Sequence, residues 1–132
     1  MISPSLLLRR AVLADAIISG AMALLLAVGA PFLAALLHLP EALLRESGLC
    51  LIVYTALVGW LGSRAAMPAA AVWAVILANA AWVLGSVALL VSGTVSPNWL
   101  GDAFVVLQAI VVGVFAELQY IGLRRSAAAI KV

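Results

Sequence analysis

The chain has 132 residues, of which 67% are hydrophobic and 9% are charged, with seven Lys and Arg against five Asp and Glu. Soluble domains carry about 25% charged and about 45–50% apolar residues, so a soluble fold of this size could not cover its apolar surface. The composition therefore predicts an integral membrane protein. It argues against nucleic-acid binding, because no basic stripe is interleaved with aromatic residues.

Four apolar stretches account for most of the sequence, and about 20 apolar residues are needed for an α-helix to cross a bilayer. The predicted spans are residues 11–39, 43–62, 69–91 and 102–123, within one all-α domain covering residues 1–132. Pro31 lies inside the first stretch and predicts a kink there. Because the connections are short, we expect successive helices to be antiparallel neighbours in a compact four-helix bundle.

The basic residues predict how the helices are oriented. With four spans, both termini and the turn at residues 63–68 share one side of the membrane. That side carries six of the seven basic residues: Arg9, Arg10, Arg64, Arg124, Arg125 and Lys131. Arg45 alone lies on the other side. Cytoplasmic loops are the ones enriched in Lys and Arg, so we expect both termini in the cytoplasm.

Three segments carry a resemblance to a known group of proteins. They are RESGL before the second span, ANAAWVLGS within the third, and FAELQYIGLRR at the end of the fourth. With these segments the chain resembles a family of small bacterial four-helix integral membrane proteins that has no assigned activity. The resemblance covers most of the chain. It implies the fold and a location in the bacterial inner membrane, and it transfers no functional site.

Two carboxylates lie inside the predicted spans, each about five residues, or ~7–8 Å, from the cytoplasmic end. An acid at such a depth is costly and needs a partner or a function. If Asp15 and Glu117 face each other, they share a proton, which is the basis of a proton-coupled site. Alternatively, each acid pairs with an arginine: Glu117 with Arg124, and Asp15 with Arg9 or Arg10. A contact with a partner protein is the third possibility.

The remaining polar and aromatic candidates lie deeper. Asn79 is near the middle of the third span, where an Asn usually bonds to a neighbouring helix for ~0.6 kcal/mol, and Gln108 is its predicted mate. Gln119 shares a helical face with Gln108. Tyr54 and Trp82 either fill the core or, together with Asn79, line a pocket for a lipid or quinone-like ligand.

The sequence offers little catalytic chemistry. Cys50 and His38 are the only residues of their kinds, which excludes an intramolecular disulfide, a multi-cysteine metal site and bis-histidine haem ligation within one protomer. We therefore expect no enzyme, no metal and no cofactor. The leading hypothesis is a small membrane protein that associates with itself or with a larger membrane complex. The alternatives are a proton-coupled homodimeric transporter and a lipid or quinone binder. Membrane lipids are partners in every case.

Overall fold

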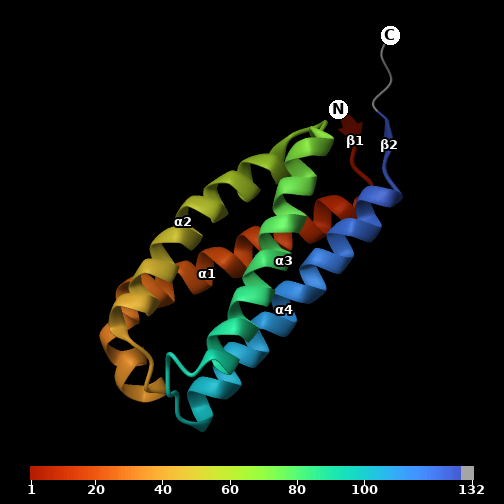
Figure 1. Ribbon diagram of the computed structural model, residues 1–132. Coiled ribbons are helices and arrows are strands. Elements are labelled where there is room, and N and C mark those ends of the chain that lie inside the picture. Colours follow the sequence, from red (N-terminus) through yellow and green to blue (C-terminus); the bar gives the residue numbers. More distant parts are fainter. Residues whose placement is uncertain (129–132) are drawn as a thin grey trace.

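A computed structural model describes residues 1–128 of the chain. It contains four helices, α1 (Leu6–Leu37), α2 (Glu41–Ser63), α3 (Ala69–Ser92) and α4 (Trp99–Arg124), and two short strands, β1 (Ile2–Ser3) and β2 (Ala127–Ala128) (Figure 1). All four helices are long and apolar enough to cross a membrane. The prediction of an all-α bundle of four candidate membrane spans is therefore confirmed.

Three helices start earlier than predicted: α2 by two residues, and α1 and α4 at side-chain caps that lie outside their predicted spans. The Ser5 hydroxyl accepts a hydrogen bond from the Leu8 N–H at 3.1 Å, so α1 begins before the apolar stretch does. The Asn98 side chain accepts from the Gly101 N–H at 2.8 Å and starts α4 inside the predicted loop. Side-chain oxygens at these positions satisfy N–H groups that have no partner within the helix. α1 continues through Pro31 without ending.

The helices form an open arrangement rather than a closed ring. α1 packs along both α2 and α4, and α3 packs along α4. α2 and α3 are joined by the turn at residues 64–68 and diverge from it (Figure 1). At this closed end, Ile2 exchanges two backbone hydrogen bonds with Met67, at 2.8 and 2.9 Å, and pairs with Ala128. These backbone pairs join the N-terminal strand, the α2–α3 turn and β2 at the closed end, and α2 and α3 diverge toward the other end.

Three glycines let neighbouring helices approach the backbone of α1 closely, namely Gly48, Gly101 and Gly122. A Cβ atom at Gly48 in α2 would lie 2.6 Å from the backbone nitrogen of Ala27. One at Gly122 in α4 would lie 2.7 Å from the Cα of Leu8. Real Cβ atoms do not approach backbone this closely, so α2 and α4 can pack at these distances only with glycine. Small residues at helix contacts are typical of membrane bundles.

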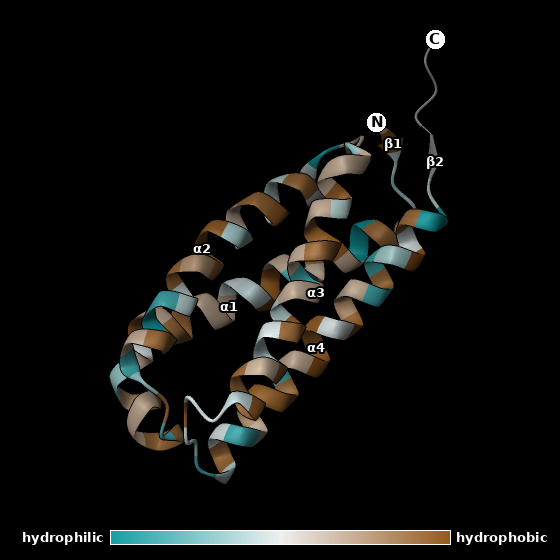
Figure 2. Ribbon diagram, in the orientation of Figure 1, coloured by the Kyte–Doolittle hydropathy of each residue, from teal (hydrophilic) through white to brown (hydrophobic). Residues whose placement is uncertain are grey.

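The apolar core is divided between the two ends of the bundle. Near the closed end, its buried residues come from α1, α2, α3 and the turn before α3: Leu8, Val12, Val58, Leu61, Met67, Val72, Val75 and Ile76. Near the open end, they come mainly from α1: Leu26, Ala30, Leu33, Leu37, Leu39, Leu44 and Val105. Hydrophobic residues predominate along all four helices (Figure 2), and large apolar side chains such as Val28 and Val91 are about four-fifths exposed. Such an exterior suits a lipid environment and indicates a multi-pass membrane protein.

Candidate functional site

A cluster of polar side chains lies inside the bundle and takes members from all four helices. We call Asp15 and Ser19 of α1, Tyr54 of α2, Asn79 of α3 and Gln119 of α4 the polar cluster. Asp15 is 1% exposed, Asn79 5% and Gln119 0%. Buried polar groups in a membrane protein need hydrogen-bond partners, and these five side chains supply them to one another.

The Asp15 carboxyl is the centre of the polar cluster. Its Oδ2 atom lies 2.6 Å from the Tyr54 hydroxyl, 3.0 Å from Asn79 Nδ2 and 2.8 Å from Gln119 Nε2. Its Oδ1 atom accepts from the Ser19 hydroxyl at 2.8 Å. Asn79 Nδ2 also donates to Gln119 Oε1 at 2.9 Å, and the Tyr54 hydroxyl lies 2.9 Å from Asn79 Oδ1. Every helix is therefore bonded to at least one other through this cluster.

A large cleft opens beside the polar cluster, between the diverging helices α2 and α3. Its volume is about 770 Å³, and all four helices contribute to its lining. Ser19, Tyr54 and Asn79 of the polar cluster form one end of it, while Leu43 and Leu89 lie toward the open end of the bundle. We call it the α2–α3 cleft. Its walls are mainly apolar, apart from Ser47, Trp82, Ser86 and Gln108, and one end carries the hydrogen-bonding groups of the polar cluster.

Two of the predicted pocket residues, Tyr54 and Trp82, both line this cleft, as Asn79 does. Trp82 Nε1 donates to Gln108 Oε1 at 2.7 Å, and Gln108 Nε2 donates to the Ser86 hydroxyl at 3.0 Å. The predicted Asn79–Gln108 pair does not form. Ser86 lies seven residues, or about 10 Å, beyond Asn79 along α3, so Gln108 is held about two helical turns away.

The two intramembrane acids are not brought together. Gln119 faces Asp15, and Glu117 lies two residues earlier on α4, about 200° around the helix. Glu117 is accordingly exposed, whereas Asp15 is buried. The depth of the two acids along the membrane was the basis for pairing them, but the pairing also requires that both face inward. A proton shared between Asp15 and Glu117 of one chain has no support in this geometry.

The arginines near these acids have other partners. Arg9 donates to the Gly62 carbonyl at 2.7 Å and to the Arg64 and Ala65 carbonyls at 2.8 and 3.2 Å. Arg10 is exposed. Arg124 donates to the Tyr120 hydroxyl at 3.1 Å and lies over its ring. Within residues 1–128, the one ion pair is Arg45–Glu41, at 2.6 Å, so the predicted acid–arginine pairs do not form.

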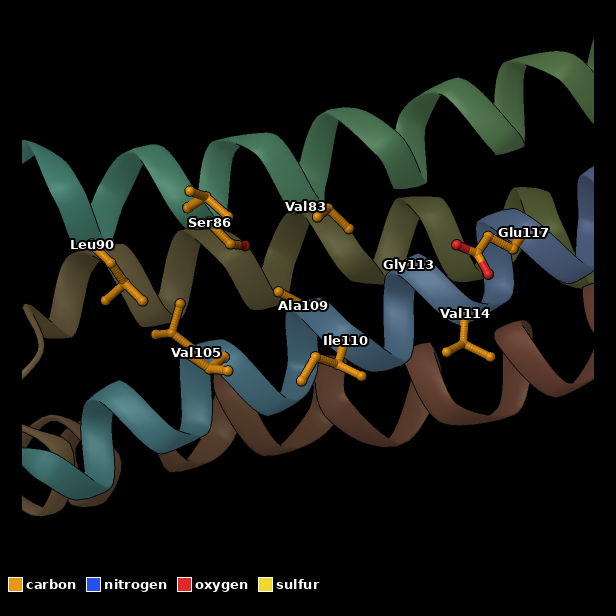
Figure 3. A pocket seen from close by; sticks show the side chains of 11 residues that line it. Val83, Ser86, Leu90, Val105, Ala109, Ile110, Gly113, Val114 and Glu117 are labelled. Carbon is orange, nitrogen blue, oxygen red and sulfur yellow. The ribbon is translucent and has the colours of Figure 1, made fainter.

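Glu117 instead lies at one end of a smaller groove between α3 and α4, which we call the α3–α4 groove (Figure 3). This groove has a volume of about 390 Å³. Its other lining residues are mainly aliphatic or small, including Val83, Ala109 and Gly113. A carboxyl on the outer face of a membrane helix is expensive, so this groove is the second feature of the molecule that calls for a partner.

Two members of the polar cluster were not among the predicted site residues. Ser19 lies one turn after Asp15, and this spacing alone places both on one face of α1. Gln119 was recognised only as sharing a face with Gln108. The signal that would have found it is the antiparallel pairing of α1 with α4, which sets Asp15 near the level of Gln119. Sequence composition does not reveal which helices are neighbours.

Comparisons with known proteins add no further assignment, since no family model, no curated relative and no solved structure matches the chain.

Proposed function

We propose that this protein binds a neutral amphiphilic molecule of the membrane in the α2–α3 cleft. One observation carries the proposal: a cleft of about 770 Å³ with mainly apolar walls ends at the Tyr54 hydroxyl and the Asn79 amide. Ligand sites in proteins have volumes of about 300–1,000 Å³ and combine apolar walls with a few polar groups that orient the ligand. The ligand class is that of the lipid or quinone binder among the sequence-based alternatives.

The electrostatics of the cleft favour a neutral ligand over a phospholipid. None of the described residues that line it is charged. Asn79 is ten residues from the start of α3, so its side chain is about 15 Å along the helix, far from either end. A phosphate placed there would be buried without a cation, which is strongly unfavourable. A head that carries a hydroxyl would instead donate its hydrogen to an oxygen of Tyr54, Asn79 or Ser19, whose own hydrogens are used within the polar cluster.

The size of the cleft is a second argument for an occupant. Protein interiors are close-packed, with few voids larger than a water molecule. In a membrane, an apolar cleft that opens between two helices is filled by lipid tails or by a specific molecule. The hydrogen-bonding end favours a specific molecule over lipid tails, because a hydrocarbon tail forms no hydrogen bond with Tyr54 or Asn79.

The test is native mass spectrometry of the gently extracted protein, followed by identification of any bound molecule. Gly85 lines the cleft, and a Cβ atom added there meets no other atom within 4 Å. Gly85→Leu should therefore fill the cleft without disturbing the helices, and the bound molecule should be lost. Gly29→Leu is the matched control, since a Cβ at Gly29 makes only ordinary contacts at 3.8 and 3.9 Å outside the cleft.

The expected result is a neutral amphiphile bound at one per chain in the natural protein and in Gly29→Leu, and absent from Gly85→Leu. Protein that carries no bound molecule, or that binds equal amounts in Gly29→Leu and Gly85→Leu, would contradict the proposal. A phospholipid as the specific occupant would contradict the electrostatic argument while leaving the cleft as the binding site.

A second candidate function, association with another copy or with a larger membrane complex, is favoured by Glu117. Its carboxyl lies exposed in the α3–α4 groove, where lipid alone would solvate it poorly. The same native spectra test this candidate. Glu117→Gln should change the proportion of assembled to single-chain protein if the groove is an interface. Single-chain protein for both sequences would count against it.

We also propose a bacterial inner-membrane location with both termini in the cytoplasm. The proposal is supported by the arginines at the closed end of the bundle, namely Arg9, Arg10, Arg64, Arg124 and Arg125, against Arg45 alone at the open end. Lys131, which the sequence-based count includes, lies outside the described residues. In this orientation the α2–α3 cleft widens toward the outer half of the membrane.

A further inference from the structure

The polar cluster contains more short oxygen–oxygen contacts than an ionised Asp15 can satisfy. The Tyr54 hydroxyl oxygen lies 2.6 Å from Asp15 Oδ2 and 2.9 Å from Asn79 Oδ1. Both distances are those of hydrogen bonds, but a phenol carries one hydrogen. The amide oxygen of Asn79 carries none. A hydrogen from the Asp15 carboxyl would supply the second bond, whereas Tyr54 alone could serve both oxygens only by sharing its hydrogen in a three-centre bond.

Turning over the Asn79 amide does not remove this requirement. As placed, Asn79 Nδ2 uses its two hydrogens to donate to Asp15 Oδ2 and to Gln119 Oε1. In the reversed orientation, the amide oxygen of Asn79 would face Asp15 Oδ2 and Gln119 Oε1. Two oxygen–oxygen contacts would then lack a hydrogen, instead of one. Amide orientation is assigned from such networks, and the network here admits one choice.

The surroundings of Asp15 point in the same direction. The groups that face its carboxyl are Ser19 from α1, Tyr54 from α2, Asn79 from α3 and Gln119 from α4. Tyr54 is the one titratable group among them, and no Lys, Arg or His of residues 1–128 bonds to Asp15. A fully buried carboxylate without a cation is unfavourable, and binding a proton removes the charge.

We propose that Asp15 is a proton-binding site, at which a neutral carboxyl donates its hydrogen to the Tyr54 hydroxyl and Tyr54 in turn donates to Asn79. With this proton in place, each of the six contacts within the polar cluster holds one hydrogen. The inference concerns the protein's own side chains and does not depend on a ligand in the α2–α3 cleft.

The bound proton also attaches α2 to α3. Within the described part of the chain, Tyr54–Asn79 is the one side-chain hydrogen bond between these two helices. Without the proton, the Tyr54 hydrogen turns to the Asp15 carboxylate. The Tyr54 and Asn79 oxygens then face each other at 2.9 Å without a hydrogen between them and repel. Proton release therefore weakens the attachment of α2 to α3 at the end of the cleft.

The composition of the chain permits a direct test, because Asp15 and Asp102 are its only aspartates. Aspartate carrying ¹³C in its side-chain carboxyl is incorporated, and the protein is examined in lipid membranes at neutral pH by infrared spectroscopy. A neutral carboxylic acid absorbs at the carbonyl frequency, well separated from a carboxylate, and the label shifts its band. The matched control is Asp102→Asn, since Asp102 is exposed in the first turn of α4.

We expect an isotope-sensitive carbonyl band in the natural protein and in Asp102→Asn, and its loss in Asp15→Asn. If the labelled Asp102→Asn protein, in which Asp15 is the only aspartate, absorbs solely as a carboxylate, the proposal is overturned. This variant decides the question even if Asp15→Asn does not fold. Tyr54→Phe removes the group that accepts the Asp15 hydrogen, so the band should move to higher frequency. An unmoved band would refute the donated bond to Tyr54.

Discussion

The closest contacts between helices depend on individual glycine residues. At Gly48 and Gly122 the space for a side chain is taken by the backbone of α1, which cannot move aside as the end of a long side chain can. Helix packing, and not local helix propensity, therefore determines which side chains these two positions accept. By helix propensity alone, alanine would be preferred to glycine.

We predict that Gly122→Ala destabilises the protein although alanine is the better helix former. The added Cβ would lie 2.7 Å from the Cα of Leu8, and overpacking of this kind costs about 1–3 kcal/mol. The measurement is the midpoint of thermal unfolding in detergent, which should fall. Gly59→Ala is the control, because its Cβ would lie 4.0 Å from that of Ala16. Equal midpoints for Gly122→Ala and Gly59→Ala would show that α1 and α4 are not in close contact.

For the polar residues, the sequence could predict the depth in the membrane but not the direction of each side chain. Depth along the membrane follows from residue number, so the sequence indicates that Asp15 and Asn79 lie inside the spans, where polar groups are costly. The direction of each side chain around its helix depends on which helices are neighbours, and short loops alone do not determine that. For this reason Glu117 was grouped with Asp15, and Gln108 was assigned the position that Gln119 occupies.

At the scale of helices, Arg9 connects α1 to the end of α2. The last carbonyls of a helix have no partner within it, and a cation near them also interacts favourably with the helix dipole. Arg9 meets both needs by donating to the carbonyls of Gly62, Arg64 and Ala65. The sequence suggested Arg9 as a partner for Asp15, since both lie near one end of the same helix. After Ser63 the chain leaves the helix, and the carbonyl oxygens of Arg64 and Ala65 lie within hydrogen-bonding distance of Arg9.

We predict that Arg9→Gln loosens the closed end of the bundle and Arg10→Gln does not. Both variants lose one positive charge at neighbouring positions, but only Arg9 bonds to the end of α2. The expected loss for Arg9→Gln is on the order of 1 kcal/mol. Hydrogen–deuterium exchange over residues 62–67 should become faster in this variant alone. Equal acceleration in both variants would indicate a charge effect and contradict the specific contact.

The helix limits follow from local sequence, whereas the cleft depends on which helices pack together. Hydropathy located the four spans, but Ser5 and Asn98 begin α1 and α4 outside the apolar stretches, because a cap needs a hydrogen-bonding oxygen and not an apolar residue. The compact bundle predicted from short loops is open on one side. α2 and α3 are joined by a five-residue turn, at residues 64–68, yet they diverge. The reason is that α2 packs along α1 and α3 packs along α4.

For the whole molecule, orientation in the membrane decides where the α2–α3 cleft opens. We predict that the closed end, with its five arginines, faces the cytoplasm, because basic residues near span ends are retained on that side. A fluorescent protein fused to the C-terminus should fluoresce, and alkaline phosphatase at the same position should be inactive. Phosphatase inserted within residues 93–98, which connect α3 to α4 at the open end, should be active.

The converse pattern, active phosphatase at the C-terminus and inactive phosphatase within residues 93–98, would contradict this orientation. It would also reverse the environment of the cleft. In the predicted orientation, the apolar part of the cleft near Leu43 and Leu89 lies in the outer half of the membrane, and Asp15 lies in the inner half. A neutral ligand would then enter between α2 and α3 from the outer half and place its head toward the polar cluster. The reversed orientation would require entry from the cytoplasmic half.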